Sequence, residues 1–282
     1  MSQEIPLITS THNRRIVEAR KLDQRKHRQR QSRFLVEGLQ ILHMALDSAQ
    51  GAAQGAGAQP IEVFYCEDLF AGTEAPALLE RFRQTGAELV PVSEHVMGSL
   101  SERDAPQGIV ATFALPETPL EELALSSDGV VVALDRLQDP GNLGTLIRTA
   151  DAVGAAAVIL IEPCVDPFDP KTVRGSMGSL FNVPLGRTSD VPALFDLLRD
   201  RGLRAVGADA HRGRAWWEGA WEGGVALILG NEAQGLSEDV RAHVEEWARL
   251  PIVGKAESLN VAVAGGVLMY AWLRANQEQT SV

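Results

Sequence analysis

The sequence predicts an α/β protein built on a mostly parallel sheet with helices on both faces. Residues 129–134 read GVVVAL, a valine-rich stretch without polar side chains, which is typical of a strand buried on both faces. Apolar stretches of strand length alternate with helical patterns along the chain, and this alternation indicates βαβ units. With 282 residues, 45% of them hydrophobic, the chain is long enough for one large domain or two ordinary ones.

The first 115 residues predict a smaller α/β domain. A helix is expected over residues 10–33, followed by a short strand over 34–36. In residues 37–49 apolar side chains recur at helical spacing, which predicts a second helix. The remaining elements are expected to be strand 61–65, helix 75–84, strand 87–92, a helix from Ser93 and strand 108–113. Residues 116–128 are rich in proline and acidic side chains, so they are expected to form a linker.

Residues 129–282 predict the second domain, in which six strands alternate with helices. After the first strand, Asn142 is expected to cap a helix, and Arg148 points away from the apolar stripe of that helix. The elements that follow are expected to be strands 156–161, 182–186 and 203–208, helix 191–200, strand 225–229, helix 237–246, strand 248–251 and a helix from Ser258. Open sheets of this kind bind ligands beyond the carboxyl ends of their strands, so chemistry is expected in those loops.

Two runs near the C-terminus combine an apolar strand with a glycine-containing loop. They are LILGNEAQGL (227–236), with Gly230, and LPIVGKAESLNVAVAGG (250–266). Glycine lets a backbone approach a ligand closely, although it also simply turns a chain. The helix from Ser258 contains two adjacent glycines, which cost about 1–2 kcal/mol of helix stability. Close packing, within the fold or against a partner subunit, is the expected compensation.

The charge of the chain is segregated. The formal net charge is −11, but residues 14–33 hold nine basic residues against only Glu18 and Asp23. This basic stripe therefore carries +7 and leaves −18 for the rest of the chain. A basic stripe on an acidic body is typical of a polyanion-binding surface, and a solvated helix face is the alternative. The candidate polyanion-binding residues in it are Arg14, Arg15, Arg25, Lys26, Arg28 and Arg30.

Cysteine usage and the start of the chain predict a cytoplasmic protein. Cys66 and Cys164 lie far apart in apolar surroundings, so neither a disulfide framework nor a metal-ligand spacing follows. The N-terminus lacks an apolar signal segment, and export is therefore not expected. The apolar run 261–273 is shorter than the roughly 20 residues that a membrane-spanning helix needs. No membrane association and no metal are expected.

The polar residues near the predicted strand ends form an arginine-and-amide set. They are Asn142, Arg148, Arg174, Ser176, Asn231, Glu232, Ser258 and Asn260. Without a strong nucleophile, such a set suits the orientation of substrates and the stabilisation of charge rather than covalent catalysis. Taken singly, Asn142 and Ser258 are also ordinary helix caps, and Glu232 is an ordinary solvated acid. His211 follows a predicted strand but is only a weak catalytic candidate.

At these residues the sequence resembles the SpoU, or TrmH-type, RNA ribose 2′-O-methyltransferases of the SPOUT superfamily. Three motifs match in order, DPGNLGTLIRTADAVGA, LILGNEAQGL and LPIVGKAESLNVAVA, over residues 130–273. KTVRGSMGSLFNVP, which contains Arg174, is also similar to the family's pattern. In the N-terminal half, FLVEGLQILHMAL and PQGIVATF resemble more loosely the L30e-like substrate-binding domain that often precedes this catalytic domain.

The resemblance implies a fold, a cofactor and a partner. In this family the C-terminal domain is an α/β fold with a deep trefoil knot, here preceded by a smaller L30e-like α/β domain. The loops of the knot hold S-adenosylmethionine, so Gly230, Leu250, Ile252 and Leu259 are implied to line the cofactor pocket. The family functions as a homodimer with the site near the subunit interface, which gives a reason for the small-residue helix after Ser258.

The resemblance also implies roles in catalysis. Arg148 corresponds to the arginine of the first motif, which is proposed to activate the ribose hydroxyl. Because a guanidinium stays protonated, we favour Arg148 as the cation that stabilises the developing alkoxide over Arg148 as a free base. Asn142, Glu232, Ser258 and Asn260 are implied to position Arg148, the ribose and the phosphate. Arg174 and the basic stripe are implied to bind RNA.

The sequence therefore predicts a cytoplasmic enzyme that transfers a methyl group from S-adenosylmethionine to a ribose 2′-hydroxyl of structured RNA. Ribosomal RNA is favoured over transfer RNA because the L30e-like extension is commoner among relatives that act on ribosomal RNA. Two alternatives stay open, a methyltransferase for transfer RNA and a non-catalytic RNA-binding or ribosome-assembly factor. The intact set of Asn142, Arg148, Glu232 and Asn260 speaks against the second.

Overall fold

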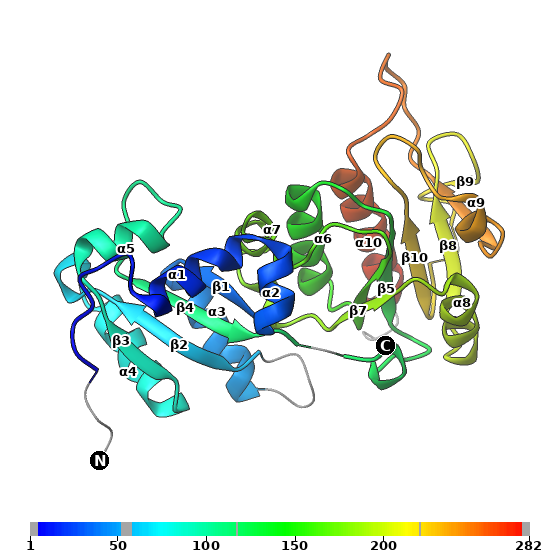
Figure 1. The fold of residues 1–282 in the computed structure, drawn as a ribbon. Coiled ribbons are helices and arrows are strands. Elements are labelled where there is room, and N and C mark those ends of the chain that lie inside the picture. The colour runs from blue at the N-terminus through cyan, green and yellow to red at the C-terminus, as the bar shows by residue number, and fades with distance from the viewer. Residues whose placement is uncertain (1–4, 52–57, 117, 220, 278–282) are drawn as a thin grey trace. The chain divides into compact units, whose positions relative to one another are not determined.

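The computed structural model describes residues 5–51, 58–116, 118–219 and 221–277, which fall into two compact units (Figure 1). One unit consists of Met1–Glu117 with Phe168–Asn182, and the other of Thr118–Pro167 with Val183–Val282. The first passage between the units falls inside the segment expected to be a linker. The return of residues 168–182 to the first unit differs from the expected division, which assigned them to the C-terminal domain.

The first unit holds a four-stranded mixed sheet in the order β1-β4-β2-β3. Its strands are β1 (Arg33–Glu37), β2 (Pro60–Tyr65), β3 (Glu88–Pro91) and β4 (Ile109–Ala114). Strand β4 is antiparallel to both β1 and β2, whereas β2 and β3 are parallel. The helices that alternate with these strands are α3 (Leu39–Gly51), α4 (Glu74–Thr85) and α5 (Glu94–Leu100), with the short turn η2 (Glu67–Leu69) after β2. The predicted α/β character of this half is confirmed.

The single helix expected over residues 10–33 is wrong. The structure has α1 (Arg14–Arg20), the 3₁₀ turn η1 (Lys21–Asp23) and α2 (Arg25–Gln31). The break comes at Gln24, whose backbone is extended. Arg28 stabilises the break, because its Nη1 donates to the carbonyl oxygens of Leu22 at 2.7 Å and Asp23 at 2.8 Å. Local periodicity could not reveal this contact, because arginine is normally a surface residue.

Arg28 is therefore a structural residue and not part of an exposed basic surface. Its side chain is only 2% exposed, and it also lies 3.9 Å from the carboxylate of Asp169. We expect Arg28→Ala to lower the free energy of unfolding by about 2–4 kcal/mol, because it leaves buried carbonyl groups without a donor. Urea unfolding measures this effect, with the exposed neighbour Lys26→Ala as the control that changes stability little. Equal stabilities of the two variants would contradict the structural role.

Residues 168–182 pack on the first unit through aromatic side chains. Phe168 lies 4.8 Å from Phe34 of β1, and Phe181 lies 5.1 Å from Phe113 of β4, measured between ring centroids. The segment forms the short helix α7 (Pro170–Gly175) and the 3₁₀ turn η4 (Ser179–Phe181). In the sequence this segment lies between two neighbouring strands of the second unit. It packs on the first unit because burial of the large aromatic rings at both of its ends stabilises it there.

The second unit contains a seven-stranded parallel sheet in the order β7-β6-β5-β10-β8-β11-β9. The strands are β5 (Val130–Asp135), β6 (Ala157–Ile161), β7 (Leu185–Thr188), β8 (Arg204–Ala208), β9 (Arg214–Ala215), β10 (Val225–Leu229) and β11 (Glu246–Arg249). All neighbouring strands pair in parallel, so the predicted parallel sheet is confirmed. The two-residue edge strand β9 was not predicted, because so short a strand leaves no periodic pattern.

Helices cover both faces of this sheet. On one face Leu194, Leu198 and Val240, from α8 (Val191–Asp200) and α9 (Glu238–Arg241), pack against alternate residues of the central strands. On the other face α6 (Pro140–Ala152) lies beside α10 (Val261–Gln277) (Figure 1). A Cβ atom at Gly265 of α10 would lie 2.6 Å from Leu146 and from Leu229, so this glycine allows the close packing that the small residues predicted.

Two expected helix caps are wrong. The cap of α6 is Asp139, whose carboxylate accepts a hydrogen bond from the backbone N–H of Asn142 at 2.7 Å. The cap of α10 is not Ser258 but Asn260, whose side-chain oxygen accepts from the N–H of Ala262 at 2.9 Å. Both changes leave the side chains of Asn142 and Ser258 available for contacts other than capping. Helix α9 is also much shorter than the helix expected over 237–246.

Within the described ranges, no helix is both long and apolar enough to cross a bilayer. The trefoil knot stays a prediction, since strand order and register describe pairing rather than threading.

Candidate active site

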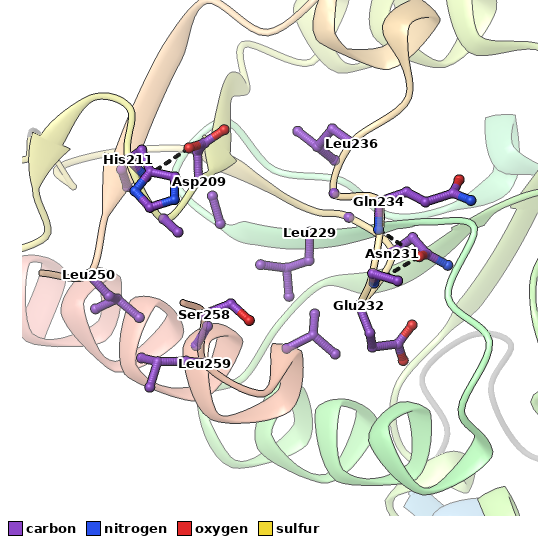
Figure 2. Close-up of a pocket in the computed structure, with 18 of the residues that line it drawn as sticks. Asp209, His211, Leu229, Asn231, Glu232, Gln234, Leu236, Leu250, Ser258 and Leu259 are labelled. Carbon is purple, nitrogen blue, oxygen red and sulfur yellow. Dashed lines mark hydrogen bonds between the residues drawn. The ribbon is translucent and has the colours of Figure 1, made fainter. Parts of the chain in front are cut away.

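A pocket of about 400 Å³ lies at the carboxyl ends of β8, β10 and β11, where a parallel sheet is expected to bind ligands. The structure brings all four expected cofactor residues, Gly230, Leu250, Ile252 and Leu259, into its lining. Two expected catalytic residues, Glu232 and Ser258, line it as well. Figure 2 shows Leu250, Ser258 and Leu259 on one side of the pocket and Asn231, Glu232 and Gln234 on another.

The loop after β10 is folded tightly by one buried amide. Asn231 is 7% exposed, and its side-chain oxygen accepts from the N–H groups of Ala233 and Gln234, each at 3.0 Å. Its Nδ2 donates to the carbonyl oxygen of Arg136 at 2.9 Å, which ties this loop to the end of β5. Asn231 was named among the polar strand-end residues but given no role, and only these contacts assign one.

A second tie joins the far end of the same loop to β5. The carboxylate of Asp135, which is 1% exposed, accepts from the N–H of Ser237 at 2.5 Å. Sequence reasoning missed Asp135 altogether. The available signal was an acid directly after a strand of valines and leucines, where a buried charge requires partners. Asn231 and Asp135 together fix the loop that presents Glu232.

Three of the expected catalytic side chains form a hydrogen-bonded chain. Asn142 donates from Nδ2 to Oε1 of Glu232 at 3.0 Å, and Asn260 donates from Nδ2 to Oδ1 of Asn142 at 2.9 Å. The three residues come from the start of α6, the loop after β10 and the segment before α10. This chain fixes the orientation of the Asn142 amide, and it leaves Glu232 as a carboxylate acceptor at the rim of the pocket.

Arg148 does not join this chain. It lies on α6 about 9 Å along the helix axis from Asn142, since each residue adds about 1.5 Å. Its side chain is exposed, it does not line the pocket, and no described residue forms a hydrogen bond or ion pair with it. The structure therefore places this cation on the exposed surface of α6 rather than at the pocket of its own chain.

Ion pairs within the first unit reduce the number of basic side chains in the stripe that are available to bind RNA. Arg15 pairs with Glu62 and Glu88, and Arg30 pairs with Glu18. The side chains of Arg14, Arg25 and Lys26 are exposed, whereas Arg28 is buried and is withdrawn as a candidate for contact with RNA. Arg174 forms an ion pair with Glu102 and keeps 41% of its side chain exposed.

Neither cysteine is suited to nucleophilic chemistry. Both thiols are buried, and neither is in a disulfide. Burial raises the pKa of Cys164 to about 11, so this thiol stays protonated near neutral pH. The described ranges also contain no group of three or more His, Cys, Asp and Glu side chains placed to hold a metal ion. The site therefore offers amides, a carboxylate and an apolar pocket rather than a covalent catalyst.

The chemistry of the pocket fits S-adenosylmethionine. Leu229, Leu250 and Leu259 supply an apolar wall suited to an aromatic base, and Asp209, His211 and Arg241 supply a polar end suited to charged groups. Gly230 is packed so closely that a Cβ atom there would lie 2.3 Å from the backbone of Gly235. Backbone therefore forms part of the wall, as expected for recognition through N–H and C=O groups.

Comparisons with known proteins assign both units. The model of the SpoU rRNA methylase family matches residues 129–270, and that of the MRM3-like substrate binding domain matches residues 13–111. The chain is 35% identical to the 23S rRNA (guanosine(2553)-2′-O)-methyltransferase of Bacillus subtilis, over 93% of this chain and 97% of that protein.

Solved structures agree with this assignment. The structure of the AdoMet-bound rRNA methyltransferase from Sinorhizobium meliloti matches with a TM-score of 0.84 and 32% identity, over 96% of this chain and 98% of that chain. The SpoU methyltransferase AviRb from Streptomyces viridochromogenes, in complex with AdoMet, matches with a TM-score of 0.83 and 29% identity, over 96% of this chain and 99% of that chain.

Proposed function

This chain belongs to the SpoU rRNA methylase family, and on that premise we propose that it transfers the methyl group of S-adenosylmethionine to a ribose 2′-hydroxyl of ribosomal RNA. One observation carries the proposal. Glu232 stands at the rim of a pocket lined by the four expected cofactor residues, and the hydrogen-bonded chain through Asn142 and Asn260 holds it there. This arrangement supports adjacent binding of substrate RNA and cofactor.

The chain's residues have to orient a weak nucleophile and stabilise its charge. When bound, S-adenosylmethionine supplies a methyl group already activated by its sulfonium. As the ribose oxygen attacks the methyl carbon, its proton passes to solvent, the methyl–sulfur bond breaks and S-adenosylhomocysteine is the leaving group, so negative charge develops on that oxygen during the attack. We assign Arg148 to stabilise this charge, because a guanidinium remains a cation throughout. Glu232, oriented by Asn142, and Ser258 at the pocket lining hold the ribose by hydrogen bonds.

Methyl transfer is the direct test. Purified protein is incubated with S-adenosylmethionine carrying a labelled methyl group and, in separate reactions, with ribosomal RNA or transfer RNA from cells that lack the protein. We expect label in ribosomal RNA, at a ribose 2′-oxygen. Label confined to transfer RNA supports the alternative substrate. RNA binding without any label would instead identify a non-catalytic assembly factor. We place the reaction in the cytoplasm, in keeping with two cysteines that form no disulfide.

We further propose that the protein is a homodimer that buries the outer face of α10. This face carries Val263, 55% exposed, and Tyr270, 53% exposed, which lie about two helical turns apart on α10. Leu259, 42% exposed, lies just before the helix begins. Large apolar side chains gathered on one helix face are typical of an interface. Arg148 lies on α6, the helix beside α10, so the same interface brings it to a second subunit.

A charge on this face is expected to separate the subunits. Tyr270→Glu places a carboxylate in an interface that has to be dry, so we expect light scattering to change from the dimer mass to the monomer mass. Leu7→Glu is the matched control, because Leu7 is a 59% exposed apolar residue of the first unit. A wild-type protein that is already monomeric at micromolar concentration would remove the proposal.

The exposed part of the basic stripe is assigned to RNA binding. Arg14 and Lys26 are exposed, and each charge that neutralises a phosphate adds about 0.9 to the slope of log affinity against log salt. The double variant Arg14→Glu/Lys26→Glu is expected to weaken RNA binding and to lower this slope by about 2. Arg83→Glu, at a 57% exposed arginine on α4, is the control. An unchanged slope in the double variant would reduce the stripe to a solvated helix face.

A further inference from the structure

Three polar side chains line the pocket on the side away from Glu232, and the proposed transfer does not use them. They are Asp209 and His211, in the loop after β8, and Arg241, at the end of α9. Figure 2 shows Asp209 and His211 across the pocket from Glu232. The apolar side chains of Leu229, Leu250 and Leu259 lie in the same pocket. The pocket therefore has an apolar part and a separate charged part.

Asp209 organises this charged part. Its Oδ1 accepts from the backbone N–H groups of His211 at 2.8 Å and Arg212 at 3.1 Å, which shapes the loop. Its Oδ2 accepts from Nη2 of Arg241 at 2.9 Å. A guanidinium has five N–H donors, and among the described residues Asp209 is its one hydrogen-bonded partner. Arg241 is thus held in place while most of its donors remain available.

Three further contacts, all with Trp247, make the arrangement rigid. The guanidinium carbon of Arg241 lies 5.6 Å from the ring centroid of Trp247, and that of Arg212 lies 4.8 Å from it. Gly213 has φ +90°, and a Cβ atom there would lie 2.1 Å from the carbonyl oxygen of Trp247. The loop is therefore pressed against β11 in a form that only glycine permits. A site organised in advance loses less entropy when it binds a ligand.

We infer that this cluster binds the amino-acid end of S-adenosylmethionine, an inference that rests on the proposed function. That end is a zwitterion, with one carboxylate and one ammonium group. A planar guanidinium can donate two parallel hydrogen bonds to a carboxylate, and a carboxylate can accept hydrogen bonds from an ammonium group. Arg241 therefore complements the carboxylate of the ligand, and Asp209 complements its ammonium group. Their own charges cancel, as do those of the ligand. His211 borders the same end of the pocket. The apolar wall is left for the adenine.

Two ligands that differ only in this end provide the test. S-adenosylhomocysteine carries the amino-acid chain, whereas 5′-methylthioadenosine has the same adenosine and a neutral sulfur without it. Calorimetric titration of the full-length protein gives both dissociation constants. We expect Arg241→Gln to weaken S-adenosylhomocysteine binding about tenfold or more and to leave 5′-methylthioadenosine binding unchanged. Arg241→Lys keeps the positive charge but not the planar guanidinium. Its dissociation constant for S-adenosylhomocysteine is expected to lie between those of the wild type and Arg241→Gln.

Arg199→Gln is the control, because Arg199 is a 66% exposed arginine on α8 that does not line the pocket. Both of its dissociation constants should equal those of the wild type. Two results overturn the inference, namely unchanged S-adenosylhomocysteine binding in Arg241→Gln, or equal weakening of both ligands, which assigns Arg241 to the adenosine part or to pocket shape. A wild-type protein that binds neither ligand removes the proposed function and this inference with it.

Discussion

Replacing Arg148 by alanine is expected to lower kcat by about 100- to 1,000-fold and to leave the dissociation constant for S-adenosylmethionine close to that of the wild type. The loss follows from removing the cation that stabilises the developing alkoxide. Cofactor affinity is spared because Arg148 is exposed and does not line the pocket. Single-turnover methyl transfer and calorimetric titration measure the two quantities separately.

Two further variants separate charge from position. Arg148→Lys retains a cation without the planar fork, so it is expected to recover part of the lost rate. Arg199→Ala removes an arginine that is 66% exposed on α8, the helix on the opposite face of the sheet. It is expected to leave kcat and cofactor affinity nearly unchanged. If Arg148→Ala turned over at the wild-type rate, the assignment of Arg148 to the transition state would be wrong.

Gly230→Ala is expected to lower kcat/KM roughly a hundredfold, because displacing a positioned loop by about 1 Å is enough for such a loss. The new methyl group would lie 2.3 Å from the carbonyl carbon of Gly235 and 2.4 Å from the N atom of Leu236. Both are backbone atoms and cannot move aside by a change of rotamer. The loop has to open, and this displaces Glu232 and the pocket wall together.

The same substitution is expected to lower the free energy of unfolding by about 1–3 kcal/mol, the usual cost of overpacking. Gly254→Ala is the matched control, since a Cβ atom there has nothing within 4 Å. Gly235→Ala also has open space but a φ of +68°, so it tests backbone strain without a clash. If Gly230→Ala and Gly254→Ala lowered kcat/KM and the free energy of unfolding by similar amounts, the close packing at Gly230 would not explain the losses.

How much of the site could be predicted depended on whether its residues lie at strand ends. Gly230 and Glu232 follow the apolar strand β10, and the carboxyl ends of parallel strands meet at one edge of a sheet, so a pattern in the sequence indicated that they lie at a site. The place of Leu250 in the pocket was instead implied by the resemblance to the family. The sequence did not indicate that the Asn142 amide reaches Glu232, because Asn142 was also the natural cap of its own helix.

The basic stripe shows the opposite case. Its charges were counted correctly, but their partners lie far away in the sequence, as Glu62 and Glu88 do for Arg15. Burial of Arg28 could not be predicted either, because it depends on a break in the helix that the side chain itself stabilises. The return of residues 168–182 to the first unit has the same origin, in contacts of Phe168 and Phe181 with distant rings.

The sequence by itself determined the α/β alternation, the buried strands and the motifs that place this chain in its family. These features are local, because hydrophobic periodicity and glycine positions are written in consecutive residues. Only the tertiary structure decided which basic residues stay exposed, which amide orients Glu232 and where Arg148 lies. Each of these depends on side chains many residues apart, and their meeting is fixed by packing that no local pattern records.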